Sequence, residues 1–373
     1  MVVKVGFLKL GNIGSATLIE FLLDERAERK DLDVRVISSG AKLSLEQGEE
    51  IVKKLLEFDP QLIILTSPNA TLPAPSKVRE RIKEANKPCI NVSDNPGKGA
   101  IEHIESLGQG YIIVEADSML GARREFLDPI EMAIFNSDII KVLAVTGVFN
   151  ALYTEIDKVL QQIKDKKDIK LPKIILDKHK AIAYSTLTNP YAISKAIAAY
   201  EISSKVSDLT VEACFKLKDW ERYTLLASAA HEMMRYASKL ADEAREMDKG
   251  SDSLRRKPHY DDGTILIKQR LIEKPRREEF VVEAKEVLNR IPLRLQKELS
   301  DKLLALLLES QNLSKIEADT QRKIVSKLRE EKLDDPEVLE SLILASLKAE
   351  KERFSSLLRE LHCFDALKMV EGI

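Results

Sequence analysis

Several features that mark special classes of protein are scarce in this sequence. Only three of its 373 residues are cysteines, namely Cys89, Cys214 and Cys363, and they lack the close spacing of a zinc or iron–sulfur site. Isolated thiols are typical of a reducing compartment, and they make a structural metal centre unexpected. No apolar run has the length of a membrane-spanning helix, and no signal peptide precedes the first strand pattern. These absences predict a cytoplasmic globular protein without a metal.

A surplus of charge of either sign is also missing. The chain carries 59 lysines and arginines against 61 aspartates and glutamates, so its formal net charge is −2 although 32% of its residues are charged. An evenly mixed surface of this kind argues against nucleic-acid binding and against an acidic tail. The motifs of P-loop nucleotide binding, of α/β-hydrolase nucleophiles and of HExxH metalloenzymes are absent, so these chemistries are not expected.

The first 128 residues contain a regular alternation of strand and helix patterns. The predicted strands are Val2–Leu10, Asp33–Gly40, Gln61–Pro68, Pro88–Asp94 and Tyr111–Asp117, and helical patterns separate them. Such alternation predicts βαβ units, and hence an α/β domain with a Rossmann-like parallel sheet over residues 1–128. In such a domain ligands bind beyond the carboxyl ends of the strands.

From about residue 129 the hydrophobic period becomes helical. Helices are predicted over Pro129–Val142, Ala151–Lys164, Tyr191–Val206 and Asp219–Lys249, which defines a helical domain at residues 129–249. A run of β-branched and aromatic residues at Thr210–Lys218 predicts one strand inside this domain. Gly250 is predicted to end the last helix in a left-handed conformation.

Two smaller segments complete the chain. Residues 250–280 are expected to form a small β-hairpin segment around a turn at Asp261–Gly263. Residues 281–373 hold one glycine and two aromatic residues, and three helices are predicted there. The signals are a capping box at Ser314–Glu317, a cap at Asp335–Pro336 and narrow apolar stripes that include Leu339 and Leu342. This helical C-terminal extension is expected to pack on its own protomer or on a partner.

Three short segments at the predicted carboxyl edge of the sheet are suited to a cofactor. The first of them opens a helix whose amino terminus can receive an anion. The residues interpreted as cofactor-binding are Gly11, Asn12, Ile13, Gly14, Ser67, Pro68, Asn69, Asp94, Pro96, Gly97 and Lys98. Each segment also has an ordinary structural interpretation, as a tight turn or as a turn with a solvated lysine.

The loop after the fifth strand carries a dense group of charged residues. It contains two adjacent arginines, and arginine binds carboxylates and phosphates in a bidentate manner. The residues interpreted as substrate-binding are Asp117, Met119, Gly121, Arg123, Arg124, Glu125 and, on a later helix, His231. Ion pairs between domains and a buried, satisfied histidine are the competing interpretations.

The usual pattern for NAD binding is incomplete. The GxGxxG fingerprint is absent, and Ser38–Ala41 stands where an acid would bind the ribose at the end of the second strand. An NAD(P)-linked dehydrogenase is therefore disfavoured.

The candidate segments together resemble the coenzyme F420-dependent methylenetetrahydromethanopterin dehydrogenases. The matching stretches include KLGNIGSA, QLIILTSPN, DNPGKG, GARREFLDP and ASAAHEM, and they run collinearly from residue 1 to about 280. The sequence departs from the family at two places. Ser118 stands where the family usually has proline, and the extension from about residue 281 is not part of the family pattern.

The resemblance implies an archaeal oxidoreductase of one-carbon metabolism and methanogenesis, with a hexameric homo-oligomer expected. Such an enzyme transfers a hydride reversibly between 5,10-methylenetetrahydromethanopterin and coenzyme F420, giving methenyltetrahydromethanopterin and reduced F420. Because the hydride passes directly between two bound ligands, no catalytic acid, base or nucleophile and no metal is expected. The alternative is a noncatalytic regulatory or scaffolding homologue in which the extension binds a partner. No membrane or nucleic-acid partner is expected.

Overall fold

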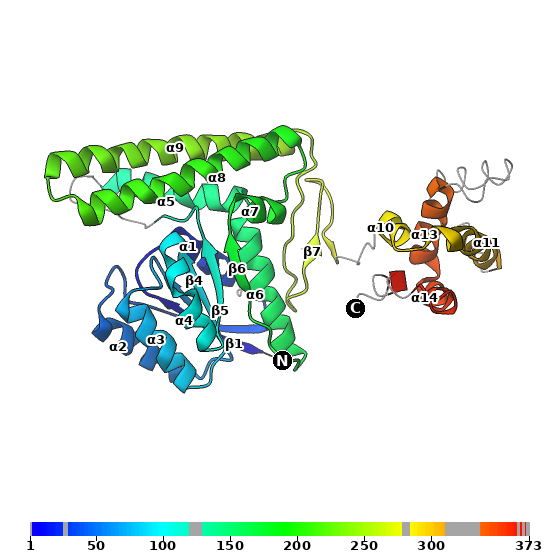
Figure 1. Cartoon of the computed structure of the whole chain (residues 1–373), viewed down its shortest axis with the longest axis horizontal. Coiled ribbons are helices and arrows are strands. Elements are labelled where there is room, and N and C mark those ends of the chain that lie inside the picture. Colours follow the sequence, from blue (N-terminus) through cyan, green and yellow to red (C-terminus); the bar gives the residue numbers. More distant parts are fainter. Residues whose placement is uncertain are drawn as a thin grey trace. The chain divides into compact units, whose positions relative to one another are not determined.

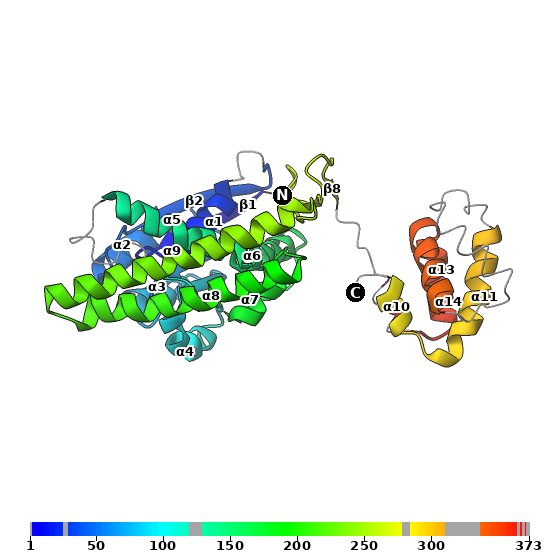
Figure 2. The ribbon, with the colours of Figure 1, turned by 90° about the horizontal axis from the view of Figure 1, so that it is seen from above.

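A computed structural model describes residues 2–24, 29–118, 129–277, 284–309, 336–363, 366, 367 and 370 of the chain. The chain divides into two compact units, Met1–Arg277 and Glu278–Ile373. Each unit has a hydrophobic core of its own, and Figures 1 and 2 show the folds of both. The finer boundaries near residues 128 and 249 stay predictions.

The first unit is built on a six-stranded parallel sheet. Its strands are β1 (Val3–Lys9), β2 (Leu32–Ser38), β3 (Leu62–Ser67), β4 (Cys89–Asp94), β5 (Gly110–Val114) and β6 (Lys173–Leu176), in the order β2-β1-β3-β4-β5-β6. Every residue of β3, β4 and β5 is buried, as parallel strands with two covered faces require. The predicted α/β fold with a parallel sheet is confirmed, and all five predicted strands are present.

The sixth strand has no counterpart in the sequence prediction. It is four residues long and follows helix α6 (Val148–Lys164), within the segment predicted to be helical. It pairs with β5 from Tyr111–Lys173 to Val114–Leu176 and forms one edge of the sheet. A four-residue run is too short to show a period, so its pairing with β5 defines it as a strand.

Helices cover both faces of the sheet. Helices α1 (Gly14–Asp24), α5 (Pro129–Val145) and α6 share one core with alternate strand residues such as Val5 and Phe7. Helices α2 (Leu45–Leu56) and α3 (Pro73–Glu84) pack against intervening residues such as Leu8, and α4 (Ile101–Ser106) packs beside β5. The strands thus expose opposite sets of side chains to two helical layers.

Two long helices lie across one end of the sheet. Helices α8 (Pro190–Val211) and α9 (Trp220–Gly250) form a hairpin, and the short α7 (Lys178–Tyr184) precedes it (Figure 1). The Ser203 hydroxyl of α8 donates to the Ala116 carbonyl oxygen at 2.7 Å, and the Tyr200 hydroxyl donates to that of Leu176. The hairpin is therefore fixed to the carboxyl ends of β5 and β6.

The predicted strand at Thr210–Lys218 is wrong. Helix α8 continues to Val211, and Glu212–Lys216 form a π-helical turn before α9. Thr210 and Ala213 are both buried, which is a helical spacing. The Thr210 hydroxyl also donates to the Ser207 carbonyl oxygen one turn earlier. Packing between α8 and α9 therefore overrides the local β preference of this run.

The predicted left-handed cap at Gly250 is also wrong. Gly250 is still part of α9, and the left-handed residue is Asp252, with a φ of 50°. The amides of Asp252 and Ser253 donate to the carbonyl oxygens of Lys249 and Asp248, which closes the helix end. Aspartate visits this conformation more readily than most side chains do, so the helix does not need the glycine to stop.

A hairpin turn forms at Asp261–Gly263, as the sequence predicts, and the bounds of its segment stay predictions. Gly263 has a φ of 84°, and its amide donates to the Tyr260 carbonyl oxygen in the turn. Antiparallel bridges join His259 with Ile265 and Arg256 with Lys268. The strands β7 (Leu266–Ile267) and β8 (Arg276–Arg277) pair further along.

The second unit is helical. Its described helices are α10 (Ala284–Asn289), α11 (Leu293–Glu309), α13 (Pro336–Ala349) and α14 (Lys351–Glu360), one more than the three predicted. Leu339 and Leu342 of the predicted stripe are buried in its core, together with Leu299, Leu303 and Phe354. The capping box at Ser314–Glu317 and the cap residue Asp335 lie outside the described residues.

In the described ranges, no single helix is long and apolar enough to cross a membrane. Helices α5 and α6 pass the test of length and composition as a pair, but the chain bends by 64° between them.

Candidate active site

The strand order places a topological switch point between β1 and β3. From β1 the chain passes to β2 on one side, and all later strands are added on the other side. In parallel α/β sheets, ligands bind in the crevice outside the carboxyl ends of the strands at such a point. Gly11 follows β1 and Pro68 follows β3, so two candidate segments of the sequence lie at the switch point.

Gly11 and Pro68 are packed against each other at this point. Gly11 has a φ of 75°, a conformation that is strained for residues with a side chain. A Cβ on Gly11 would lie only 3.1 Å from Cδ of Pro68. The Gly11 amide also donates to Oγ of Ser39 at 3.4 Å. The turn after β1 therefore approaches the loops after β2 and β3 closely, and glycine makes this approach possible.

Asp117 binds the amino terminus of α1. Its Oδ1 accepts the Gly14 amide and its Oδ2 accepts the Ser15 amide, both at 2.8 Å. The first turn of α1 has no acidic residue, so Asp117 supplies the negative charge that favours a helix start. Burial raises the pKa of Asp117 to about 6, although the bonds from Ser15 and Gly14 lower it. Asp117 thus fixes α1 to the end of β5, and a role toward a substrate stays a prediction.

Asp94 ends β4 and is electrostatically coupled to Asp117. Its side chain is buried, and Oδ1 has no hydrogen-bond partner among the described residues. Burial and the charge of Asp117 raise the pKa of Asp94 well above its ordinary value. Such surroundings favour the protonated carboxyl, which can donate a hydrogen bond. Asn95 Oδ1 and Ser118 Oγ, near the same strand ends, are also buried without a partner in the described part of the chain.

The turn after β4 is packed tightly against the loop after β3. Ser93 Oγ accepts the Ala70 amide at 3.1 Å. A Cβ on Gly97 would lie 2.5 Å from the same oxygen, which is closer than real contacts allow. Glycine at position 97 therefore lets the turn lie close to β4. This packing agrees with the interpretation of the segment as an ordinary turn.

Two further candidate side chains already have protein partners. Asn69 Oδ1 accepts the amide and the hydroxyl of Thr71 at 2.9 and 2.6 Å, which shapes the loop after β3. The Lys98 ammonium pairs with Glu115 at 2.5 Å, yet 40% of the Lys98 side chain is exposed. A ligand can reach Lys98 from solvent, and its role as a cofactor contact stays a prediction.

His231 is a residue of α9, and its side chain faces α5. Its ring stacks on Phe135 with a centroid distance of 3.8 Å, and Nδ1 is 3.7 Å from Glu131. Burial lowers the pKa of His231, so the neutral ring is favoured. Neither ring nitrogen has a hydrogen-bond partner among the described residues. These contacts of His231 are with α5, whereas the other candidates lie at strand ends.

The remaining candidates lie outside the described residues. They are Met119, Gly121, Arg123, Arg124 and Glu125, and they directly follow Ser118. Within the described ranges, no group of three or more His, Cys, Asp or Glu side chains is placed to bind a metal ion.

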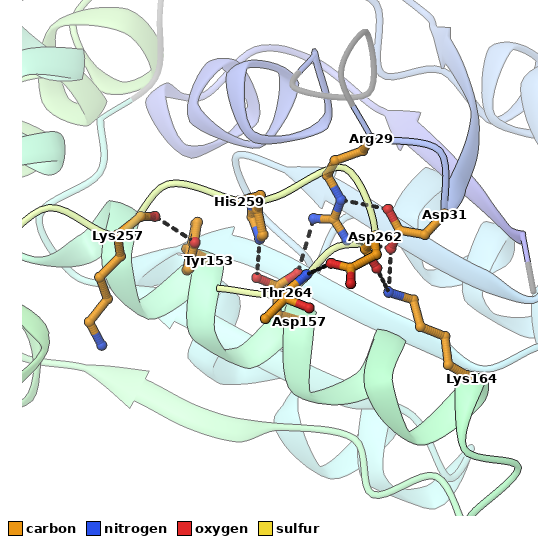
Figure 3. A network of polar contacts seen from close by, with 9 residues as sticks. All are labelled: Arg29, Asp31, Tyr153, Asp157, Lys164, Lys257, His259, Asp262 and Thr264. Carbon is orange, nitrogen blue, oxygen red and sulfur yellow. Dashed lines mark hydrogen bonds and ion pairs between the residues drawn. The ribbon is translucent and has the colours of Figure 1, made fainter. Parts of the chain in front are cut away.

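A buried ionic network near the β-hairpin has no counterpart in the sequence prediction. Arg29 is almost fully buried, and its Nε and Nη2 donate to the Asp31 carboxylate at 2.9 and 2.8 Å. Its Nη1 reaches Asp157 at 3.4 Å, and Asp157 in turn contacts His259 Nε2 at 2.6 Å (Figure 3). Lys164 also pairs with Asp31. The residues are far apart in sequence, so only the fold reveals that they tie the hairpin to the sheet domain.

Comparison with known proteins identifies the family. The family model described as methylene-5,6,7,8-tetrahydromethanopterin dehydrogenase matches residues 3–276. The chain belongs to this family. The F420-dependent methylenetetrahydromethanopterin dehydrogenase of Archaeoglobus fulgidus is 52% identical over 275 residues, which are 74% of this chain and 100% of that protein. The protein of the same name from Methanocaldococcus jannaschii is 48% identical over 276 residues, with the same coverage.

A solved structure is also similar. It shows F420-dependent methylene-tetrahydromethanopterin dehydrogenase in complex with methylene-tetrahydromethanopterin and coenzyme F420. Its sequence is 43% identical, its TM-score is 0.70, and the match covers 74% of this chain and 100% of that chain. The family match ends at residue 276, beside the end of the first unit at Arg277. The first unit is therefore the family domain, and the second unit extends beyond these relatives.

Proposed function

We propose that the chain catalyses reversible hydride transfer between 5,10-methylenetetrahydromethanopterin and coenzyme F420, with methenyltetrahydromethanopterin and reduced F420 as products. The observation that carries this proposal is the match of residues 3–276 to the dehydrogenase family, with relatives aligned over their full length. The related structure binds both compounds at once. A noncatalytic homologue is not favoured, because half of the residues of the complete relatives are retained.

The residues of this chain contribute to the reaction by binding and orientation. Bound coenzyme F420 supplies or accepts the hydride. The protein must hold two ligands in contact, and rigid positions lower the entropic cost of doing so. Gly11 and Pro68 are packed together at the switch point, and Asp117 fixes the start of α1. We propose that the segments Gly11–Gly14, Ser67–Asn69 and Asp94–Lys98 bind the coenzyme.

The buried polar atoms at the ends of β4 and β5 fit a ligand that offers hydrogen-bonding partners. Asp94 Oδ1, Asn95 Oδ1 and Ser118 Oγ lack partners in the described part of the chain. A protonated Asp94 donates to a ligand oxygen and keeps its proton throughout, because hydride transfer needs no general acid. The substrate is proposed to lie toward Asp117 and the segment Met119–Glu125, with His231 on the helical side.

We also propose a homo-oligomer located in the cytoplasm. Trp220, Leu225 and Tyr236 of α9 and Ile130 of α5 are each at least 60% exposed. Several large apolar side chains on neighbouring helices are typical of a subunit interface. Cys89, Cys214 and Cys363 form no disulfide, which fits a reducing compartment. The mass of the assembly in solution tests the oligomer.

Purified protein supplied with methylenetetrahydromethanopterin and oxidised F420 tests the activity. The deazaflavin absorbance should decrease, and NAD and NADP should not be reduced. Turnover should survive strong chelators. Equal or faster turnover with a nicotinamide would contradict the proposal, and absence of F420 reduction would favour the noncatalytic alternative.

Two substitutions test the proposed ligand contacts. Lys98→Ala and Arg124→Ala should each raise KM for one ligand by more than they lower the melting temperature, since both positions follow strand ends where anionic groups are expected. Lys53→Ala serves as a control, because it removes the same charge from the exposed face of α2. Unchanged kinetics in both variants would assign the two residues to structural roles.

A further inference from the structure

A pocket of about 760 Å³ opens in the first unit between the end of α5, the start of α6, the end of α9 and the β-hairpin segment. Its cationic lining residues are Lys141, Arg245, Arg255, Arg256, Lys257 and Lys268. Asp242 is the single acid among the described residues that line it. Such an excess of positive charge around a half-open pocket attracts anions.

The fold itself holds two of these cations opposite each other. Arg256 and Lys268 form an antiparallel bridge, in which each backbone amide donates to the other residue's carbonyl oxygen at 2.7 and 2.9 Å. Like charges at directly opposite positions destabilise an antiparallel pair. Desolvation and the neighbouring charge of Arg256 also lower the pKa of Arg245. An anion between these side chains would relieve the repulsion.

The start of α6 borders the same pocket. The N-cap residue Gly147 has a φ of 99° and provides no side-chain cap, and the first turn has no acidic residue. Phe149 and Asn150 of this turn line the pocket. The dipole at the start of a 17-residue helix favours a negative group nearby.

One turn further along α6, Tyr153 fixes the hairpin segment to the helix. Its hydroxyl donates to the Lys257 carbonyl oxygen at 2.6 Å. Figure 3 shows that the Lys257 side chain then extends away from the ionic network around Arg29. The backbone that carries Arg256 and Lys257 is therefore held in place at the pocket.

The single described acid of the lining pairs with one lysine. Asp242 pairs with Lys141 at 2.6 Å. In the described part of the chain, Arg245, Arg256 and Lys268 have no carboxylate within ion-pair distance. Arg256 Nη1 donates to the carbonyl oxygens of Leu254 and Gln269. These neutral acceptors leave the positive charge of the three side chains uncompensated.

We propose that this pocket binds a small, multiply charged oxyanion, which is a compound with phosphate or carboxylate groups. Guanidinium groups hold such oxyanions in a bidentate manner, and lysines add point charges. The partial positive charge at the start of α6 acts in the same direction. The oxyanion is either part of one ligand of the proposed reaction or belongs to a separate effector. The binding of an oxyanion at this pocket does not depend on the proposed activity.

Calorimetric titration of the full chain with inorganic pyrophosphate tests the site. We expect one binding event per chain, with an affinity that falls as salt screens the charges. The double variant Arg256→Gln, Lys268→Gln should bind about tenfold more weakly or not at all, because charge-assisted hydrogen bonds are lost. The control variant Lys218→Gln, Arg222→Gln makes the same change in charge near the opposite end of α9 and should bind like the unchanged protein.

A gain of affinity provides a second readout that does not depend on a weakened variant. Asp242→Asn removes the single described acid of the lining and releases Lys141, so pyrophosphate should bind about two- to fivefold more tightly. Circular dichroism confirms that each variant is folded.

Competition identifies the source of the oxyanion. Displacement of pyrophosphate by coenzyme F420 assigns the pocket to the coenzyme, and displacement by methylenetetrahydromethanopterin assigns it to the substrate. Displacement by neither supports a separate effector site. The proposal is overturned if pyrophosphate does not bind. It is also overturned if both the double variant and Asp242→Asn bind pyrophosphate as tightly as the control and the unchanged protein do. The titration needs no turnover, so its failure is distinct from failure of the dehydrogenase activity.

Discussion

Asp117 accepts a hydrogen bond from the backbone amide of Gly14 at 2.8 Å, across 103 positions of sequence. The bond joins the segment after β5 to the helix that follows β1. A Cβ on Gly14 would lie 2.9 Å from the same carboxylate oxygen, so the glycine permits this close contact. Two parts of the candidate site are thus fixed to each other by the fold, which is the support that precise ligand orientation needs.

The stability of the first unit should fall as the pH rises from about 4 to about 6. Burial raises the pKa of Asp117 to about 6, and burial together with Asp117 raises that of Asp94. The folded state then holds protons that the unfolded chain releases, which costs up to about 1.4 kcal/mol per pH unit for each proton. Asp31 has the opposite effect, because its pKa in the folded protein is lowered to about 2. Its contribution to the stability of the first unit is lost only as the pH falls below about 4.

Thermal unfolding of the unchanged protein and of Asp94→Asn across this pH range measures the effect. The decline should be shallower in Asp94→Asn, because one of the two raised carboxyls is removed. Equal pH slopes in the two proteins would show that Asp94 does not retain its proton in the folded state.

Gly97→Ala should destabilise the first unit by about 1–3 kcal/mol, which is the usual effect of overpacking. The added Cβ would meet Ser93 Oγ at 2.5 Å and Ser93 Cβ at 2.6 Å. Gly250→Ala is the matched control, because it adds the same methyl group at the end of α9 where nothing lies within 4 Å. Denaturant unfolding should show no loss of stability for the control. Similar midpoints for the two variants would contradict the tight packing at Gly97.

Arg29→Met should lower the free energy of unfolding by up to about 3–5 kcal/mol, because the buried carboxylates of Asp31 and Asp157 lose the guanidinium and, among the described residues, keep only Lys164 and His259 as partners. Arg35→Met is the control. Arg35 forms the same kind of pair with Asp33, two positions away. The side chains of Arg35 and Asp33 are both exposed, so the loss should stay below about 1 kcal/mol. Equal losses in urea unfolding would show that burial does not set the strength of the Arg29 network.

A chain that ends at Arg277 should keep its turnover with F420. The family match ends at residue 276, and the second unit has its own core around Leu303, Leu342 and Phe354. Residues 278–373 should therefore unfold in a separate transition in calorimetry of the full chain. The extension is expected to pack either on its own protomer or on a partner, and an unchanged number of subunits per assembly after its removal would favour the first of these. Loss of turnover with the fold and the oligomer intact would show that the extension reaches the active site.

Local sequence patterns predict most of the first unit, because the preferences of its residues agree with the strands and helices that they form. Buried aliphatic runs such as Leu62–Ser67 are typical of central parallel strands, and the Gly11–Gly14 turn shows where the first helix starts. The prediction fails at Thr210–Lys218, where β-branched and aromatic residues prefer a strand in isolation. The packing of α8 on α9 contributes more than this preference, so the segment is helical.

The sequence by itself determined the parallel α/β class, the position of the strand-end segments and the family resemblance, because each depends on residues close together in the chain. The tertiary structure alone decided the place of β6 at the sheet edge, the partners of Asp117 and Arg29, and the basic pocket between α5, α6, α9 and the hairpin. Contacts of this kind join segments that are far apart in sequence. The hydrogen bond from Lys30 to Asp261, for example, spans 231 positions. No local pattern encodes such contacts, since they form only when distant elements pack together.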